Sequence, residues 1–257
     1  MTVKLHARQQ GSGAHLISLH GLFGSLENLG MINRILGNEL CVHGLDLRNH
    51  GRSPHSREMN YVAMAGDVLE YLDEQQLDQV YLLGHSMGGK VAMTLALKHP
   101  RRIAGLVVID IAPVTYYQRH HDRILAGLSS IDLNGLSQRN QADQHLSHFV
   151  AEKEIRQFLL KNLYKNDQGL YGWRANLGVI AEHYQEIMSG QQSEYPFKGK
   201  TLFIKAGDSD YLVPEHQEVT LKLFPNAQVK IITGAGHWVH AQKPDLVSRT
   251  ILRFLTP

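Results

Sequence analysis

The sequence is poor in the features that mark secreted and membrane-spanning proteins. It contains a single cysteine, Cys41, in 257 residues, so no intramolecular disulfide can form. No apolar run approaches the ~18 residues of a membrane span, and residues 1–13 lack the apolar segment of a signal peptide. These absences predict a protein that does not insert stably into a membrane. They also predict that it resides in the reducing cytoplasm.

Neither the charge nor the spacing of histidine and cysteine indicates a particular partner. The formal net charge is +2, too small to suggest binding to nucleic acid or to an anionic membrane. The 16 histidines are scattered, and neither an H-E-x-x-H nor a C-x-x-C pattern occurs. Cys41 lies in an apolar segment, where a small buried thiol is the expected role. We therefore expect no nucleic-acid partner and no metal site, and nothing in the sequence indicates an oligomeric state.

Short apolar segments alternate with helical patterns along the chain. This alternation favours an α/β fold with a mostly parallel central sheet and helices on both faces. The predicted strands are residues 15–19, 40–47, 80–83, 105–109, 201–206 and 229–232. The predicted helices are residues 61–75, 87–99, 219–224 and 246–255.

One long segment, residues 110–200, interrupts this alternation, although a crossover between parallel strands needs only about a dozen residues. It carries its own helical stripes of apolar residues, namely Ile124, Leu125, Leu128, Ile155, Phe158, Leu159, Leu163, Val179, Ile180, Tyr184 and Ile187. We predict that residues 1–113 and 196–257 form the core. Residues 114–195 would be an inserted helical cap over the carboxyl edge of the sheet, where ligands bind in open α/β folds. A peripheral helical decoration is the alternative.

A G-x-S-x-G pattern, Gly84-His85-Ser86-Met87-Gly88, falls between a predicted strand and a predicted helix. This context is that of a nucleophile elbow, in which a sharp turn exposes the serine hydroxyl. A Cβ at either glycine would crowd such a turn. The Met87 N–H would lie at a helix start, free to stabilise an oxyanion. A purely structural glycine turn is the alternative.

A serine nucleophile needs a base, and the base needs an acid that orients it. The candidate base is His237, on a glycine-rich segment between the last predicted strand and the C-terminal helix. His240 is its local competitor.

Two aspartates are candidates for the acid, and each follows a predicted strand. Asp110 follows Leu106-Val107-Val108-Ile109, where a carboxylate is costly to bury without a hydrogen-bonding partner such as a histidine. Asp210 follows the next core strand, in a Gly/Asp/Ser cluster that is also typical of a turn.

The second oxyanion donor is expected from residues 20–24, His-Gly-Leu-Phe-Gly, which follow the first predicted strand. The glycines allow the loop to fold back, so that the Leu22 N–H, or alternatively the Phe23 N–H, points at the reacting carbonyl oxygen. We expect His20 to fix this loop by hydrogen bonding. Residues 46–53 form a further loop, interpreted as scaffold in preference to a substrate contact.

Together these motifs resemble the α/β-hydrolase superfamily over essentially the whole chain, and more closely a group of bacterial esterases with mitochondrial relatives. The order serine, acid, histidine is the one expected for that fold. The matching segments are residues 20–25, 28–30, 48–51, 84–90, 110–113 and 234–241. The elbow is common to the superfamily, whereas the motifs at residues 110–113 and 236–241 are typical of a much smaller group within it.

The resemblance implies that Asp110 is the acid, although Asp210 occupies a position that many other α/β-hydrolases use. It also implies activity towards short-chain esters and acyl thioesters, including acyl-CoA, with no metal or organic cofactor. We therefore expect a serine esterase or acyl-CoA thioesterase in which Ser86, His237 and Asp110 form the triad. A carbon–carbon bond hydrolase and a non-catalytic small-molecule receptor are the alternatives.

A group of basic residues near the start of the predicted cap bears on the acyl-CoA interpretation. It consists of Arg119, His120, His121 and Arg123. These side chains could attract an anionic head group such as that of CoA. A solvated basic helix face is the alternative that we favour.

Overall fold

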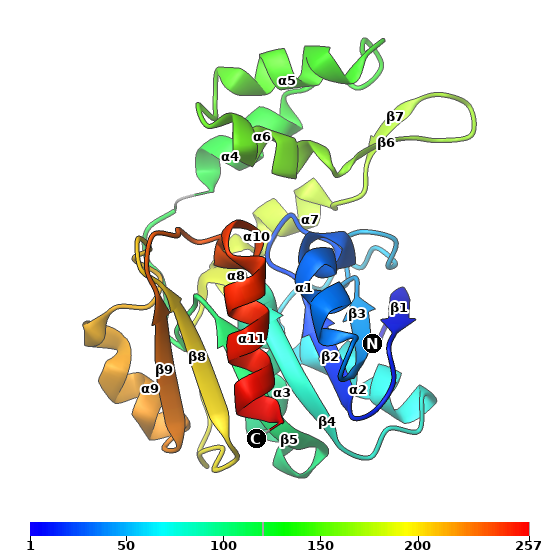
Figure 1. Cartoon of the computed structure of the whole chain (residues 1–257). Helices are drawn as coiled ribbons and strands as arrows, with labels where there is room; N and C mark the ends of the chain where they lie inside the picture. The colour runs from blue at the N-terminus through cyan, green and yellow to red at the C-terminus, as the bar shows by residue number, and fades with distance from the viewer. Residues whose placement is uncertain (120, 257) are drawn as a thin grey trace.

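A 7-stranded sheet forms the centre of the molecule in the computed structural model, which describes residues 1–119 and 121–256 (Figure 1). Its strand order is β1-β3-β2-β4-β5-β8-β9. The strands are β1 (Ala7–Gln10), β2 (His15–Leu19), β3 (Cys41–Leu45), β4 (Val80–His85), β5 (Ile103–Ile109), β8 (Thr201–Ala206) and β9 (Ala227–Ile232). All neighbouring strands are parallel except β1, which pairs antiparallel with β3. The predicted mostly parallel α/β sheet is thereby confirmed.

Helices cover both faces of this sheet, as predicted. On one face, α1 (Gly30–Leu36) packs beside α11 (Pro244–Leu255), and their apolar residues join one hydrophobic cluster. On the other face, α2 (Tyr61–Glu74) packs against α3 (Met87–Lys98) in a second cluster. The remaining core helices are η1 (Leu26–Leu29), η2 (Pro100–Arg102), η3 (Pro214–His216), α9 (Gln217–Leu223) and α10 (Val239–Gln242). None of the helices in the described residues has the length and apolar character needed to cross a bilayer.

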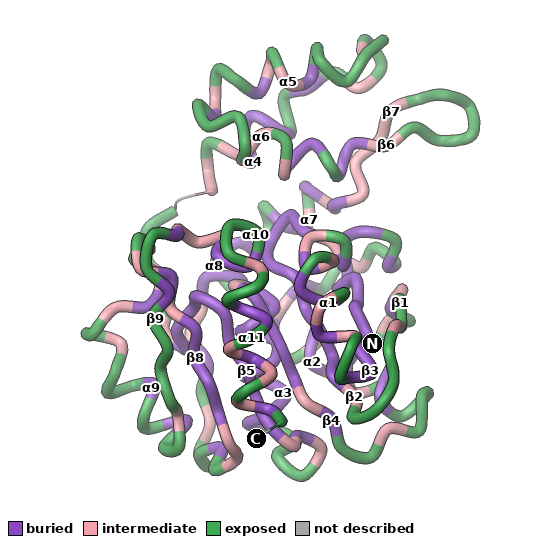
Figure 2. Tube along the Cα trace, in the orientation of Figure 1, coloured by how far each residue is buried: buried purple, intermediate pink, exposed green. Residues whose placement is uncertain are grey.

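The long segment between β5 and β8 is a separate layer of mainly helical structure. Figure 1 places most of it beyond one end of the sheet strands, and Figure 2 shows its outer surface as largely exposed. Its elements are α4 (Asp122–Ser129), α5 (Arg139–Ser147), α6 (Lys153–Leu160), the hairpin β6 (Leu163–Lys165) and β7 (Tyr171–Trp173), α7 (Leu177–Glu182) and α8 (Tyr184–Met188). The sequence did not predict the hairpin. The division into a core and a cap of residues 114–195 remains a proposal.

A buried lysine of α3 joins the two ends of this inserted segment. The Lys90 ammonium donates to the carbonyl oxygen of Val114 at 2.8 Å and also to that of Ser189. The Tyr116 N–H donates to the Met188 carbonyl oxygen at 2.9 Å. This hydrogen bond joins the same two segments of the chain directly. Burial lowers the pKa of Lys90 to about 7. The stretch between Val114 and Ser189 therefore begins and ends at one place, next to Lys90.

Candidate active site

The turn between β4 and α3 has the geometry of a nucleophile elbow. Ser86 has φ 52 and ψ −122, a conformation that residues other than glycine rarely adopt. A Cβ on Gly84 would lie 2.2 Å from the Gly88 carbonyl oxygen, and one on Gly88 would lie 2.3 Å from the Leu19 carbonyl oxygen. Only glycine therefore fits at either position, and the backbone turns sharply enough to present the Ser86 side chain to the cavity that it lines.

The carboxylate that follows β5 is fully buried, and protein groups satisfy both of its oxygens. Asp110 Oδ1 accepts from the Ala206 N–H at 2.9 Å, and Oδ2 accepts from His237 Nδ1 at 2.8 Å. Oδ2 also accepts a hydrogen bond from the Ser209 hydroxyl. The structure therefore brings the predicted acid and the predicted base into direct contact, across 127 residues of sequence. Three donors compensate the cost of burying this charge.

The alternative acid, Asp210, has a different environment. Its side chain is exposed and lines the cavity, and within the described residues it forms no hydrogen bond with His237. The neighbouring Ser209 is buried and donates to Asp110 instead. Our sequence analysis did not single out Ser209, and its only signal was its place in the turn after β8. The geometry thus favours Asp110 over Asp210 as the partner of the histidine.

The imidazole of His237 is oriented by two contacts. Its Nδ1 faces Asp110, and its ring stacks on that of Tyr211 with centroids 4.1 Å apart. Because the Nδ1–H donates to the carboxylate, the Nε2 atom carries the free lone pair and can accept a proton. The competitor His240 lies behind His85, with ring centroids 4.2 Å apart, and burial lowers its pKa to about 3. His240 is therefore not the residue paired with the acid.

Two backbone N–H groups remain available for an oxyanion near Ser86. In the described part of the chain, neither the Leu22 nor the Met87 amide donates to another protein group. The Phe23 amide, the alternative donor, instead donates to His50 Nε2 at 3.2 Å. Leu22 and Ser86 line the same cavity, and Met87 begins α3, where the helix dipole adds positive potential.

His20 fixes the loop that carries Leu22, as predicted. Its Nδ1–H donates to the Gly21 carbonyl oxygen at 2.8 Å, and its Nε2 accepts from the Leu47 amide at 3.0 Å. The imidazole is fully buried, and this burial lowers its pKa to about 4. A neutral ring with one donor and one acceptor atom satisfies both backbone groups at once.

The loop of residues 46–53 is scaffold, as the sequence indicated. Arg48 is fully buried and contacts both carboxylate oxygens of Asp67, at 2.6 and 2.7 Å. Asn49 adopts φ 63, and its carbonyl oxygen accepts from the Asn176 amide of the inserted segment at 2.9 Å. The loop therefore connects the core with the segment above it.

A cavity of about 400 Å³ lies between the elbow and the inserted segment. Ser86 and His237 line it on the core side. Its lining from the inserted segment includes Ile124, Ile155, Phe158 and Leu159, all residues of the predicted helical stripes. The cavity thus combines a polar floor with an apolar roof, which is typical of sites for small molecules.

Most of the basic group at the start of the inserted segment is engaged within the protein. Arg119 Nε contacts the Asp122 carboxylate at 2.7 Å, and its guanidinium lies 4.7 Å from the centre of the Tyr184 ring. His121 Nδ1 lies 2.9 Å from the Tyr184 hydroxyl oxygen, and His120 lies outside the described residues. These contacts agree with a solvated helix face more than with a preformed anion site.

Buried neutral histidines predict a loss of stability in acid. Burial lowers the pKa of His20 to about 4 and those of His50 and His240 to about 3. In the unfolded chain these groups titrate near the ordinary value of about 6.5. The unfolded chain therefore binds more protons than the folded protein between about pH 6.5 and pH 4, and stability falls as the pH falls through this window.

The expected decrease in the free energy of unfolding is about 1.4 kcal/mol per pH unit for each histidine inside the window. Urea denaturation at a series of pH values measures it. The variant His240→Asn removes one titrating group, so its slope should be smaller than that of the parent protein. If the free energy of unfolding changed equally steeply with pH in the two proteins, the lowered pKa of His240 in the folded protein would be wrong.

Comparison with known proteins identifies the family to which this geometry belongs. Residues 14–244 match the alpha/beta hydrolase fold family, and the chain is a member of it. Within that family it is a hydrolase of the esterase and lipase group. Both the fold and the resemblance predicted from the motifs are confirmed.

The relatives include both bacterial and animal proteins. Esterase YbfF of Escherichia coli is 41% identical over 97% of this chain and 96% of its own length. The sn-1-specific diacylglycerol lipase ABHD11 of Xenopus tropicalis is 40% identical, with 95% of this chain and 78% of the relative covered. Among solved structures, a marine microorganism esterase matches with a TM-score of 0.97 and 38% identity, over 98% of this chain and 100% of that one.

Proposed function

We propose that the protein is a serine carboxylesterase that works through an acyl-enzyme formed on Ser86. The observation that carries this proposal is the 2.8 Å contact between His237 Nδ1 and the buried Asp110 carboxylate, beside a cavity that Ser86 also lines. A histidine held in this tautomer, with a partly buried serine on the same cavity, is the arrangement that activates a hydroxyl for acyl transfer.

Each residue has a distinct role in the proposed reaction. His237 Nε2 accepts the proton of the Ser86 hydroxyl as its oxygen attacks the ester carbonyl carbon, and Asp110 stabilises the imidazolium that forms. The Leu22 and Met87 N–H groups stabilise the negative oxygen of the tetrahedral intermediate. The imidazolium then protonates the leaving alcohol. Water, activated by the same histidine, hydrolyses the acyl-enzyme.

The proposed substrates are small esters and acyl thioesters, including acyl-CoA. Esters and thioesters pass through the same kind of tetrahedral intermediate, so one nucleophile and one oxyanion site serve both. The apolar roof formed by Ile124, Ile155 and Phe158 suits a hydrocarbon acyl chain, and a cavity of about 400 Å³ suits a short one. No metal or organic cofactor takes part in this reaction.

Substrates of graded chain length test the proposal. We expect hydrolysis of p-nitrophenyl esters with the highest kcat/KM for short acyl chains, because the roof limits the space beyond them. The same series of acyl-CoA thioesters compares the two substrate classes. A fluorophosphonate probe should label Ser86, as located by mass spectrometry. A labelled serine without ester or thioester hydrolysis would favour carbon–carbon bond hydrolysis, and an unlabelled, inactive protein would favour a receptor.

The roof offers a matched pair of variants for the same test. Phe158 lines the cavity, with its ring centroid 5.9 Å from that of Trp238. Phe158→Ala enlarges the space for the acyl chain and should shift the preference towards longer esters. Leu170 is exposed beside the hairpin β6–β7 and does not line the cavity, so Leu170→Ala should leave the preference unchanged.

A further inference from the structure

Strand register brings three metal-ligating side chains together near the start of β2 and β3. His15 opens β2 and is the register partner of Cys41, the first residue of β3. His43 lies two residues beyond Cys41 on β3, and side chains two residues apart point to the same face of a strand. The sequence has no contiguous metal motif, because these ligands come from two strands that are distant in sequence.

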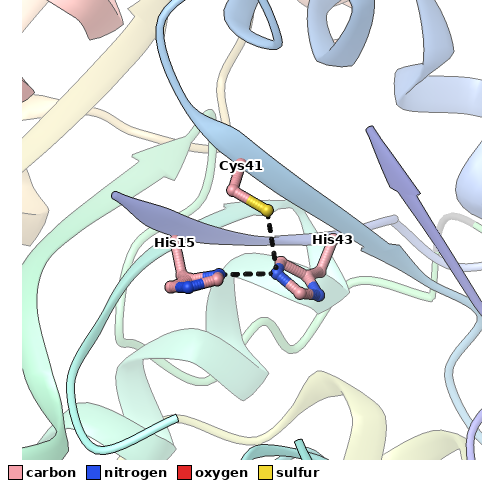
Figure 3. Close-up of side chains that lie close together, drawn as sticks. All are labelled: His15, Cys41 and His43. Atoms are coloured by element: carbon pink, nitrogen blue, oxygen red, sulfur yellow. Dashed lines mark hydrogen bonds between the residues drawn. The ribbon is translucent and has the colours of Figure 1, made fainter. Parts of the chain in front are cut away.

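The ligand atoms are already close to the spacing that a tetrahedral metal requires (Figure 3). His15 Nδ1 lies 2.9 Å from His43 Nε2, and Cys41 Sγ lies 3.5 Å from the same nitrogen. All three atoms lie within 4.8 Å of one another. Zinc bonds of about 2.1 Å to nitrogen and about 2.3 Å to sulfur place two nitrogens about 3.4 Å apart, and a nitrogen and a sulfur about 3.6 Å apart, in a tetrahedron. Small side-chain rotations therefore suffice to place the three atoms around one ion.

Neighbouring polar groups orient and support these ligands. The other ring nitrogen of His43, Nδ1, lies 2.9 Å from the Tyr71 hydroxyl oxygen, which fixes the ring and leaves Nε2 facing the cluster. Gln9, the register partner of His43 on β1, donates from Nε2 to Cys41 Sγ at 3.0 Å. The Gln9 amide thus holds the Cys41 side chain from the side of β1, as the hydrogen-bonding partners of metal ligands commonly do.

We propose that His15, Cys41 and His43 form a binding site for a zinc-type divalent ion. One sulfur and two imidazole ligands suit this borderline-soft ion, whereas magnesium and calcium prefer oxygen ligands. Cys41 and His43 are buried, and His15 is only partly buried, so solvent can supply a fourth ligand. The ion would join β2 to β3 beside β1.

This site is distinct from the proposed esterase site and takes no part in its reaction. His15 begins β2, whereas the loop that carries Leu22 follows the other end of the same strand at Leu19. An ion that binds only the folded protein stabilises it in proportion to ln(1 + [metal]/Kd). The readout is therefore the stability of the protein, and activity is a separate measurement.

Thermal denaturation of metal-free protein with increasing zinc tests the proposal. We expect the Tm of the parent protein to rise with zinc concentration, and Cys41→Ser to weaken the apparent affinity by at least ~100-fold, because a ligand is lost. His15→Asn, at the partly buried ligand, provides a second variant in case Cys41→Ser folds poorly. His148→Gln, an exposed histidine outside the cluster, should respond to zinc as the parent does.

Cobalt identifies the ligands independently, since it occupies zinc sites and absorbs light. The parent protein with cobalt should show a sulfur-to-metal charge-transfer band that Cys41→Ser lacks. Absence of any Tm rise or cobalt band in the parent would overturn the proposal. Equal zinc responses in the parent, Cys41→Ser and His15→Asn would also overturn it, and would place the ion at other histidines.

Discussion

Ser86→Ala is expected to lower kcat for ester hydrolysis by about 10³-fold or more, with the fold unchanged. The substitution removes one hydroxyl from the elbow, and without it no acyl-enzyme can form. Steady-state hydrolysis of a short p-nitrophenyl ester measures the effect. Near-parental turnover by this variant would reject the proposed nucleophile.

Ser86→Gly separates the loss of chemistry from a loss of structure. It should be as inactive as Ser86→Ala, because it also lacks the hydroxyl. Glycine adopts φ 52 without the strain that a side chain causes, so this variant should unfold at a higher temperature than Ser86→Ala. An inactive enzyme that is at least as stable as the parent has lost its nucleophile and not its fold.

Asp110→Asn is expected to lower kcat by up to about 10⁴-fold, and Asp210→Asn to leave it close to that of the parent. An amide in place of the Asp110 carboxylate favours the wrong imidazole tautomer of His237 and does not stabilise the imidazolium. Asp210 is exposed, and asparagine accepts similar turn conformations and hydrogen bonds there. Measuring kcat of both variants and of the parent protein with the same ester substrate tests this prediction.

Stability must be measured alongside, because Asp110 accepts hydrogen bonds from Ala206, Ser209 and His237. Urea denaturation and near-ultraviolet circular dichroism identify any Asp110→Asn protein that has lost its native packing. The rate at which a fluorophosphonate labels the folded Asp110→Asn variant should fall, relative to the parent protein, by the same factor as its kcat. If Asp210→Asn is the inactive enzyme and Asp110→Asn is not, the acid has been assigned to the wrong strand.

The core elements could be predicted because burial dictates their composition. Strands β2 and β8 were predicted with the limits that the structure has, since both are short, mainly apolar segments and are almost entirely buried. Strand β1, Ala7-Arg8-Gln9-Gln10, was missed because an edge strand that is half exposed needs no apolar pattern. The hairpin β6–β7 was missed for a similar reason, since each of its strands has only a few residues and limited burial.

The proposed site was predictable to the extent that its residues lie in contiguous motifs. Ser86 and His237 stand in glycine-rich segments with a recognisable context, and Asp110 follows a strand too apolar to leave a carboxylate without a partner. Ser209 and the cluster of His15, Cys41 and His43 depend on strand register and on contacts between distant segments. Those relations appear only when the chain is folded, because no local pattern encodes which strands are neighbours.

The contact of Lys90 with both ends of the inserted segment has a consequence for how this protein can be changed. Because Val114 and Ser189 are held by one ammonium, the intervening chain closes a loop whose ends are already in place. Doubling the length of such a loop costs only about 0.6 kcal/mol in closure entropy. With respect to closure entropy alone, we therefore expect the core to accept an insert of another length between these two points, provided that the new insert packs against the same core residues. If the proposed site is correct, exchanging this segment between related enzymes should change the preferred acyl chain and leave the proposed roles of Ser86 and His237 unchanged.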